Sequence, residues 1–275
     1  MRQELTSPPK WEPQASRLID EASRNIRLLG CVTPINLRAE VAALRKAYDN
    51  GQPRLPRFEY GRADYGALVN QLERGAAELE ALPQDALKSL YIDRTRELTL
   101  EAKLCMTVGT EAFGGLANER YPRRDSFDEA ADALCHEWLR AADESSHAAD
   151  AEPTIRSDDA LDPRSLLSQM RSMVGARRLG VRVVVSSRLA ALAATGPGAV
   201  YVASGHMLTA TAAHRTVLHE IEGHVLPRIR AAQAALGIFR SGTRYGSDDQ
   251  EGRALCIEDK AGFLLATRRA ELARR

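Results

Sequence analysis

Residues 218–228 read LHEIEGHVLPR and place His219 and His224 five positions apart. Each residue of a regular α-helix turns by about 100°, so side chains five positions apart would diverge by about 140°. One π-helical turn, in which hydrogen bonds run from residue i to residue i+5, inserts an extra residue and brings the two imidazoles onto one face. Gly223 adds backbone freedom there, and Pro227 cannot donate a hydrogen bond to the preceding turn. The stretch therefore predicts a local π-helical turn that carries two metal ligands.

Two histidines alone do not make a catalytic zinc site, which needs three protein ligands and one open position. Residues 246–259, GSDDQEGRALCIED, are predicted to form a second helix with Asp248 or Asp249 as its cap. Glu251 lies in the first turn of this predicted helix and is the expected third ligand. Glu258 lies two turns further along the same face, where its carboxylate can accept the ring N–H of a ligating histidine and fix the tautomer.

Glu220 directly follows the first histidine and is not needed to bind the ion. A catalytic zinc ion lowers the pKa of a bound water to about 7 and polarises a carbonyl group as a Lewis acid. Glu220 is then placed to act as the general base and later to protonate the leaving amine. These parts favour zinc-dependent hydrolysis of peptide-like amide bonds.

Two alternatives stay open at this point. The chain has six histidines, and His214 and His219 are also five positions apart, so an ordinary charged helix face would give a similar pattern without an ion. Two histidines and a carboxylate also suit iron, which would support a different metal chemistry.

The bulk composition excludes several kinds of partner. The chain has 275 residues, 44% of them hydrophobic, which is enough for one large domain or two small ones. Its 38 basic and 37 acidic residues give a net charge of +1, so no global field attracts nucleic acid or an anionic membrane. No apolar run approaches the roughly 20 residues of a membrane span, and the N-terminus lacks the apolar core of a signal peptide. We expect a cytoplasmic protein without nucleic-acid or membrane partners.

The remaining sequence predicts an α+β, mainly helical fold. Two β-rich runs, residues 181–187 and 199–205, are separated by the turn sequence TGPG and are predicted to be a strand pair or part of a small mixed sheet. Ser126 and Glu129 form a predicted capping box at the start of a helix. Apolar periodicity and capping signals predict further helices over residues 14–29, 34–50, 63–81 and 93–108, and from about residue 209 onward.

A change of composition suggests how the chain is divided. Residues 141–162 contain seven acidic side chains and one arginine, with little apolar periodicity, as is typical of a loop. We therefore expect a helical N-terminal region over residues 1–145, an acidic loop or boundary over residues 146–165 and a catalytic region over residues 166–275. The catalytic region is expected to be gluzincin-like, with a small sheet and two metal-bearing helices. One continuous domain is the alternative.

The motifs resemble a known family of metallopeptidases, named for a QEGLA motif and described as flavohemoglobin-expression-modulating, which includes the microtubule-associated tyrosine carboxypeptidases. HEIEGH, residues 219–224, matches the family's HExxxH, and QEGRA, residues 250–254, matches QEGLA. The resemblance extends over nearly the whole chain. Its helical part is carried by NIRLLGCVTPINLRAE (25–40), PRFEY (56–60) and ELTLEAKLCMTVGTEAF (97–113).

The resemblance implies a zinc cofactor held by His219, His224 and Glu251, with Glu220 as the catalytic glutamate. Carboxypeptidase action on a peptide or protein is implied by the resemblance alone. The alternative is a catalytically inactive, regulatory binding protein that keeps the metal site as a structural feature. Family members usually continue beyond the equivalent of LATRRAELARR, so we expect either an open cleft or a partner chain that completes it.

Several other residues are candidates for contacts with the substrate. Arg253 stands where the family usually has leucine, and it either binds a substrate carboxylate through a bidentate pair or points to solvent. Tyr245, Arg244 and His206 are candidates for stabilising a tetrahedral oxyanion, and spacing does not choose among them. The run AVYVASGH, residues 199–206, is either the edge strand on which an extended substrate lies or a plain core strand.

Overall fold

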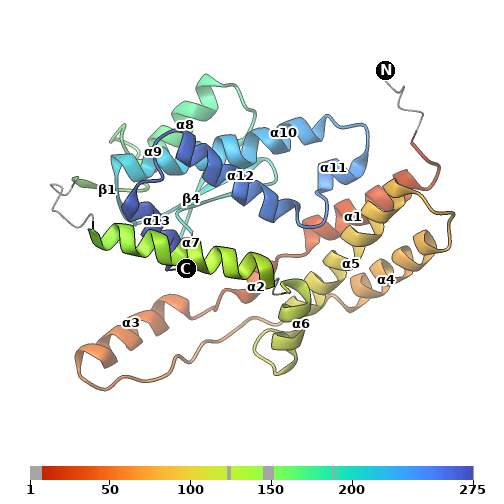
Figure 1. Cartoon of the computed structure of the whole chain (residues 1–275), viewed down its shortest axis with the longest axis horizontal. Coiled ribbons are helices and arrows are strands. Elements are labelled where there is room, and N and C mark those ends of the chain that lie inside the picture. Colours follow the sequence, from red (N-terminus) through yellow and green to blue (C-terminus); the bar gives the residue numbers. More distant parts are fainter. Residues whose placement is uncertain (1–7, 123–124, 145–151, 188, 190, 275) are drawn as a thin grey trace. The chain divides into compact units, whose positions relative to one another are not determined.

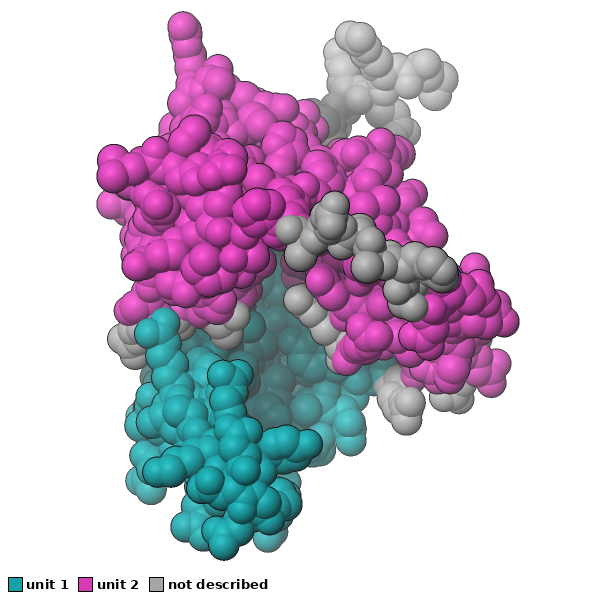
Figure 2. Space-filling model, turned by 90° about the vertical axis from the view of Figure 1, so that its left-hand side faces the viewer, with its two compact units in different colours: residues 1–123, 234–244 teal, residues 124–233, 245–275 magenta. Residues whose placement is uncertain are grey.

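The computed structural model describes residues 8–122, 125–144, 152–187, 189 and 191–274, and it is mostly helical with two small sheets. The predicted α+β, mainly helical class is confirmed. Two compact units make up the chain (Figure 2). The first comprises residues 1–123 and 234–244, and the second comprises residues 124–233 and 245–275.

Helices that pack on the long central helix α5 build the first unit. In Figure 1, α1 and α4 lie alongside α5, and the buried side chains of Ile19, Leu72 and Leu98 meet in the core that these three helices share. Burial of these apolar groups is the main favourable contribution to their packing. The helices are α1 (Glu12–Asn25), α2 (Leu28–Val32), α3 (Leu37–Asp49), α4 (Gly66–Glu80), α5 (Ala86–Thr107), α6 (Ala112–Arg120) and α11 (Gly237–Ser241).

A buried carboxylate joins three helices of this unit. Glu12 on α1 is only 4% exposed and accepts hydrogen bonds from Ser16 Oγ at 2.5 Å, from the Tyr91 hydroxyl and from the backbone N–H of Gly237 at 2.8 Å. Burial raises the pKa of Glu12, but these three hydrogen bonds outweigh burial and lower it. A Cβ on Gly237 would lie 2.1 Å from Ser16 Oγ, so only glycine fits there. The carboxylate therefore holds α11 against α1 and α5.

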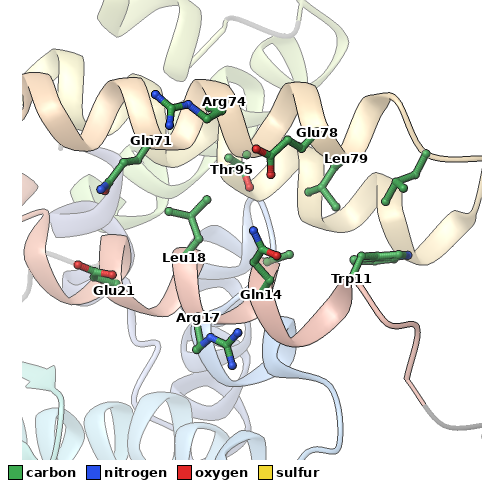
Figure 3. A pocket seen from close by; sticks show the side chains of 13 residues that line it. Trp11, Gln14, Arg17, Leu18, Glu21, Gln71, Arg74, Glu78, Leu79 and Thr95 are labelled. Atoms are coloured by element: carbon green, nitrogen blue, oxygen red, sulfur yellow. The ribbon is translucent and has the colours of Figure 1, made fainter.

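A groove of about 530 Å³ runs between α1 and α4 in the first unit. Figure 3 shows Leu18, Leu79 and Trp11 among the side chains that line it, with polar side chains from both helices around them. The polar side chains are Gln14, Arg17 and Glu21 from α1, and Gln71, Arg74 and Glu78 from α4.

The second unit combines helices with both sheets. In the three-stranded sheet the order is β2-β4-β3, with β2 parallel and β3 antiparallel to β4. In the two-stranded sheet β1 pairs antiparallel with β5. The elements are α7 (Asp125–Glu144), β1 (Thr154–Arg156), α8 (Leu166–Ala176), β2 (Arg182–Ser186), β3 (Ala193–Gly196), β4 (Ala199–Ala203), β5 (Met207–Thr209), α9 (Ala210–Leu218), the π-helix η1 (His219–Val225), α10 (Leu226–Ala232), α12 (Gly246–Lys260) and α13 (Ala266–Ala273).

The core of this unit lies between the three-stranded sheet and the helices α8, α9 and η1. Val200 and Val202 of β4, Met170 of α8 and Ile221 of η1 are all fully buried in one apolar cluster. Because β4 is the central strand, the run 199–206 is a core strand, and the edge-strand interpretation of that run is wrong. The strand β3, which the sequence did not predict, forms one edge of this sheet, and β2 forms the other.

Several predicted boundaries differ from the structure. The helix predicted over residues 14–29 is broken at Ile26, whose backbone is extended, so that α1 and α2 are separate. Residues 154–156 of the predicted acidic loop form β1 because they pair with β5. The helix α12 begins at Gly246, so Asp248 and Asp249 lie within its first turn and do not cap it.

The two compact units also differ from the predicted division at residues 145 and 166. The helix α7, which was predicted to be part of the N-terminal region, contacts α13 and belongs to the second unit. Residues 234–244 belong to the first unit. Independent folding of the predicted regions stays a prediction.

The side chain of Ser126 and residues 145–151 of the acidic loop lie outside the part that is described. None of the described helices combines the length and the hydropathy that a bilayer crossing requires.

Candidate metal centre

The predicted π-helical turn is confirmed. Residues His219–Val225 form η1, which continues directly from α9 and leads into α10, with Pro227 in the first turn of α10. Gly223 has a packing role, because a Cβ there would lie 2.5 Å from the Cβ of Ala254 on α12. Glycine at this position lets η1 and α12 approach closely, which brings their polar side chains together.

Three of the predicted ligands converge at this approach. The Nε2 atoms of His219 and His224 are 3.3 Å apart, and the two carboxylate oxygens of Glu251 lie 3.4 Å and 3.3 Å from them, respectively. In a tetrahedral zinc site with bonds of about 2.0–2.1 Å, neighbouring ligand atoms are separated by about 3.3–3.4 Å. The two histidine nitrogens therefore have the spacing of neighbouring zinc ligands, and each has a different oxygen of Glu251 at that same spacing.

The position of a fourth ligand is open to solvent on the side of Glu251. The side chain of Glu251 is 61% exposed, whereas those of His219 and His224 are 16% and 15% exposed. An ion bound by these three groups would thus have protein on one side and access to water on the other. Among the described residues, these three form the one group of histidine, cysteine and acidic side chains with such convergent ligand atoms.

Glu258 supports the first histidine as predicted from its spacing. Its Oε1 lies 2.7 Å from His219 Nδ1, and the side chain is 1% exposed. Burial raises the pKa of Glu258, but hydrogen bonds from His219 and Arg268 outweigh burial and lower it to about 2. Since Glu258 is therefore ionised, His219 Nδ1 donates the hydrogen bond and Nε2 faces the other ligands.

Arg268 on α13 is a supporting residue that the sequence did not reveal. Its Nε and Nη2 donate to Oε2 and Oε1 of Glu258 at 3.0 Å and 3.2 Å. Burial lowers the pKa of His219, but its hydrogen bonds with Glu251 and Glu258 raise it to about 9. A cation that binds Nε2 would therefore displace a proton at neutral pH.

The second histidine has a weaker partner. His224 Nδ1 lies 3.5 Å from Oε1 of Gln250, the residue that precedes Glu251 in the QEG sequence. This separation is long for a hydrogen bond, so Gln250 orients the ring less firmly than Glu258 orients His219.

Glu220 is buried, and the strand β3 holds its carboxylate. Thr195 Oγ1 donates to Glu220 Oε2 at 2.8 Å. Sequence reasoning missed Thr195 because no periodicity marks the short run AATG, residues 193–196, as a strand. The hydrogen bond fixes one carboxylate oxygen of Glu220, whose side chain lines the same cavity as His219 and Glu251.

A cavity of about 420 Å³ in the second unit connects these groups. His219, Glu220 and Glu251 line it, and so do the supporting residues Glu258 and Arg268. The other residues that line it are Ala191, Leu192, Ala193, His206, Arg215, Thr216, Leu255 and Leu272.

The four weaker candidates occupy different places. His206 lines the cavity, whereas Arg253 is exposed on α12 and is not among the residues that line it. Arg244 belongs to the first unit, where its Nη1 lies 3.9 Å from Asp93. Tyr245 precedes α12 with a left-handed backbone (φ 59°), and it is also not among the lining residues.

A family model described as microtubule-associated tyrosine carboxypeptidase matches residues 46–275, which include η1, α12 and the whole cavity. Comparisons with curated proteins and with solved structures gave no significant match.

Proposed function

This chain belongs to the microtubule-associated tyrosine carboxypeptidase family, and from that premise we propose that it is a zinc-dependent peptidase that acts at the C-terminal end of a peptide or protein. The main support is the convergence of His219, His224 and Glu251 at separations of 3.3–3.4 Å. These residues would hold the ion. When bound, zinc acts as a Lewis acid toward the scissile carbonyl and makes a water molecule a better nucleophile at neutral pH.

Glu220 is proposed as the general base. Its Oε2 is occupied by the hydrogen bond from Thr195, so Oε1 is the oxygen available to take a proton from the attacking water. The same carboxyl group would then return the proton to the leaving amine. Thr195 acts as a positioning residue because it limits rotation of the carboxylate.

His206 and β3 are proposed to contact the substrate. His206 lies on the cavity wall, where its ring can donate a hydrogen bond to the oxyanion that develops from the scissile carbonyl. Among the described strands, β3 pairs only with β4, and its first residue, Ala193, lines the cavity. An extended substrate segment can therefore add to the sheet along β3 by backbone hydrogen bonds.

The proposal is tested with zinc-loaded protein and a peptide library read by mass spectrometry. Peptides with a C-terminal tyrosine come first, because the family description names that residue. We expect loss of a single C-terminal residue. Replacement Glu220→Gln should reduce hydrolysis by about 10²- to 10⁴-fold while the zinc content is unchanged, because it removes the base and keeps the ligands.

The matched control is Glu222→Gln. Glu222 lies in the same π-helix but pairs with Arg177 and is not among the residues that line the cavity. Its replacement should leave hydrolysis within about twofold. A wild-type protein that binds zinc and cleaves no peptide would instead support the regulatory alternative, and protein that purifies with iron and no zinc would contradict the peptidase proposal.

A further inference from the structure

The helix α3 carries an apolar stripe on one face. Its four side chains follow an i, i+4, i+7, i+11 pattern, so at about 100° per residue they fall within about 60° of the helix circumference. They are Leu37, Val41, Leu44 and Tyr48. Val41 is 45% exposed and Tyr48 is 76% exposed, whereas Glu40 is the one residue of this fully described helix that is buried. A helix with such a stripe ordinarily buries it against another element, so the exposed face calls for a partner.

Polar contacts rather than the stripe attach α3 to the rest of the first unit. Glu40 accepts hydrogen bonds from the Arg54 guanidinium at 2.6 Å and 3.0 Å and from the backbone N–H of Arg57 at 2.6 Å. Among the helices and strands that the structure describes, α3 packs closely on none. Figure 1 shows it apart from α1 and α4, which belong to the same unit. The stripe is therefore available to a surface outside the chain.

The groove between α1 and α4 matches the stripe in length and in chemical character. Its α1 side runs from Trp11 to Glu21, which is about 15 Å at 1.5 Å per residue, and the stripe of α3 spans about 16 Å. In Figure 3, Leu18 and Leu79 point into the space between the two helices. Gly75 also lines the groove and has no side chain to fill it. An amphipathic helix binds such a groove by inserting its apolar anchors between the two sides.

The charges around the groove are compatible with those of α3. Each side of the groove carries one arginine and one glutamate, all exposed: Arg17 and Glu21 on α1, and Arg74 and Glu78 on α4. None of these four forms an ion pair with another described residue. On α3, Arg38 and Arg45 flank the stripe on one side and are also exposed. In either direction, a docked α3 would lay both arginines along a side that offers a glutamate.

We propose that α3 of one copy docks in the α1–α4 groove of a second copy of this chain, and that two copies thereby form a dimer. The groove and α3 belong to the same unit, so the exchange can be reciprocal and can cover both stripes in a closed, twofold arrangement. Apolar burial supplies most of the affinity, because exposed ion pairs contribute little. The inference goes beyond the proposed function and requires neither a bound metal nor a substrate.

The mass of the full chain in solution tests the dimer. Sedimentation equilibrium over about 1–200 µM protein should show a reversible change from 30.2 kDa to twice that mass. The double substitution Val41→Ser/Tyr48→Ser removes apolar surface from the stripe and should raise the dissociation constant of the dimer by about 10-fold or more. Both side chains are exposed in the single chain, so the variant should fold, which circular dichroism checks.

The matched control is Leu161→Ser. It removes an apolar side chain that is 94% exposed and belongs to the second unit, so the dissociation constant should stay within about twofold. Equal weakening by this substitution would mean unspecific association of exposed apolar side chains and would overturn the proposal.

A synthetic peptide of residues 36–50 serves as the probe for the groove. In Val41→Ser/Tyr48→Ser protein that also carries Trp138→Phe, Trp11 is the one remaining tryptophan, and it lines the groove. Its emission should change saturably as the peptide is added. A peptide that carries serine at positions 41 and 48 is the matched control and should leave the emission unchanged.

Each of the opposite results would overturn the proposal. Protein that stays monomeric throughout, or a dimer that Val41→Ser/Tyr48→Ser leaves as tight as the wild type, would exclude docking through α3 and leave the groove to a small molecule or a helix of another protein. Masses that rise beyond the dimer would exclude the reciprocal exchange. Trp11 emission that does not respond to the peptide of residues 36–50 would exclude the groove as the binding site of α3.

Discussion

Glu12 in the first unit and Glu258 in the second are both buried carboxylates, 4% and 1% exposed, with lowered pKa values. Their donors differ. Glu12 accepts from two hydroxyl groups and a backbone N–H, whereas Glu258 accepts from an imidazole and a guanidinium. A buried charge is costly unless it is hydrogen-bonded, and both sites meet this requirement.

The choice of donors tells us what each carboxylate does. The donors of Glu12 belong to α1, α5 and α11, so the network joins three helices. Glu258 instead fixes the orientation and tautomer of His219, whose other nitrogen faces His224 and Glu251. Replacing Glu12 should therefore affect stability, and replacing Glu258 should affect metal binding.

In the comparison of Glu12 with Glu258, the largest effect is expected from Glu258→Gln. The substitution keeps the size of the side chain but removes the charge that holds His219 Nδ1–H and Arg268. Loss of such a partner of a metal-ligating histidine typically weakens metal binding 10- to 100-fold. Competition with a chromophoric chelator measures the zinc affinity. Glu12→Gln is the matched control and should change the affinity by less than about twofold, so equal losses in both variants would refute the comparison.

Glu12→Gln should lower the unfolding free energy of the first unit by about 1–3 kcal/mol, because donors buried around the carboxylate lose their charged acceptor. The chain has two tryptophans, Trp11 in the first unit and Trp138 in the second. Trp11 packs edge-on against Tyr91, at 5.1 Å between ring centroids. In a Trp138→Phe background, urea unfolding followed by fluorescence reports on this unit. No change in the midpoint would contradict the structural role of Glu12.

The stability of the first unit should also depend on pH through Glu12. Its pKa is lowered from 4.5 in the folded state, so its carboxylate stabilises the fold above about pH 4.5, and this contribution is lost as the pH falls through the folded pKa. Between pH 6 and pH 3, the urea midpoint should fall more steeply for the Trp138→Phe protein than for the same protein with Glu12→Gln. Parallel curves would mean that other groups govern the acid sensitivity.

The smallest effect is expected from Gln250→Ala. Gln250 Oε1 lies 3.5 Å from His224 Nδ1, compared with 2.7 Å between Glu258 Oε1 and His219 Nδ1. A long contact with a neutral acceptor contributes little, so zinc affinity should fall by less than about threefold. A loss as large as that of Glu258→Gln would show that both histidines depend equally on their acceptors.

The sequence predicted the π-helical turn and the convergence of His219, His224 and Glu251 because the spacing of these residues leaves few solutions. The spacing of five positions from His219 to His224 requires a π-helical turn if both rings are to share a face. Glu251 and Glu258 are two turns apart on one helix and lie on the same face. If Glu251 reaches the two histidines, Glu258 is therefore expected on the same side of the helix, within reach of one of their rings.

The supporting residues were harder to predict because tertiary contacts define them. Thr195 and Arg268 come from β3 and α13, and nothing in their local sequence marks them as partners of Glu220 and Glu258. Residues 234–244 belong to the first unit, where the backbone N–H of Gly237 donates to Glu12, a residue more than 200 positions away. The break at Ile26 was missed because apolar periodicity continues through it.

X-ray absorption at the zinc edge tests most directly whether the π-helical turn creates the metal centre. For zinc-loaded wild type, we predict nitrogen and oxygen ligands at about 2.0–2.1 Å, including two imidazoles, and no sulfur. The signal of one imidazole should disappear in His224→Ala. A spectrum with sulfur at about 2.3 Å, or one that His224→Ala leaves unchanged, would contradict a site built from His219, His224 and Glu251.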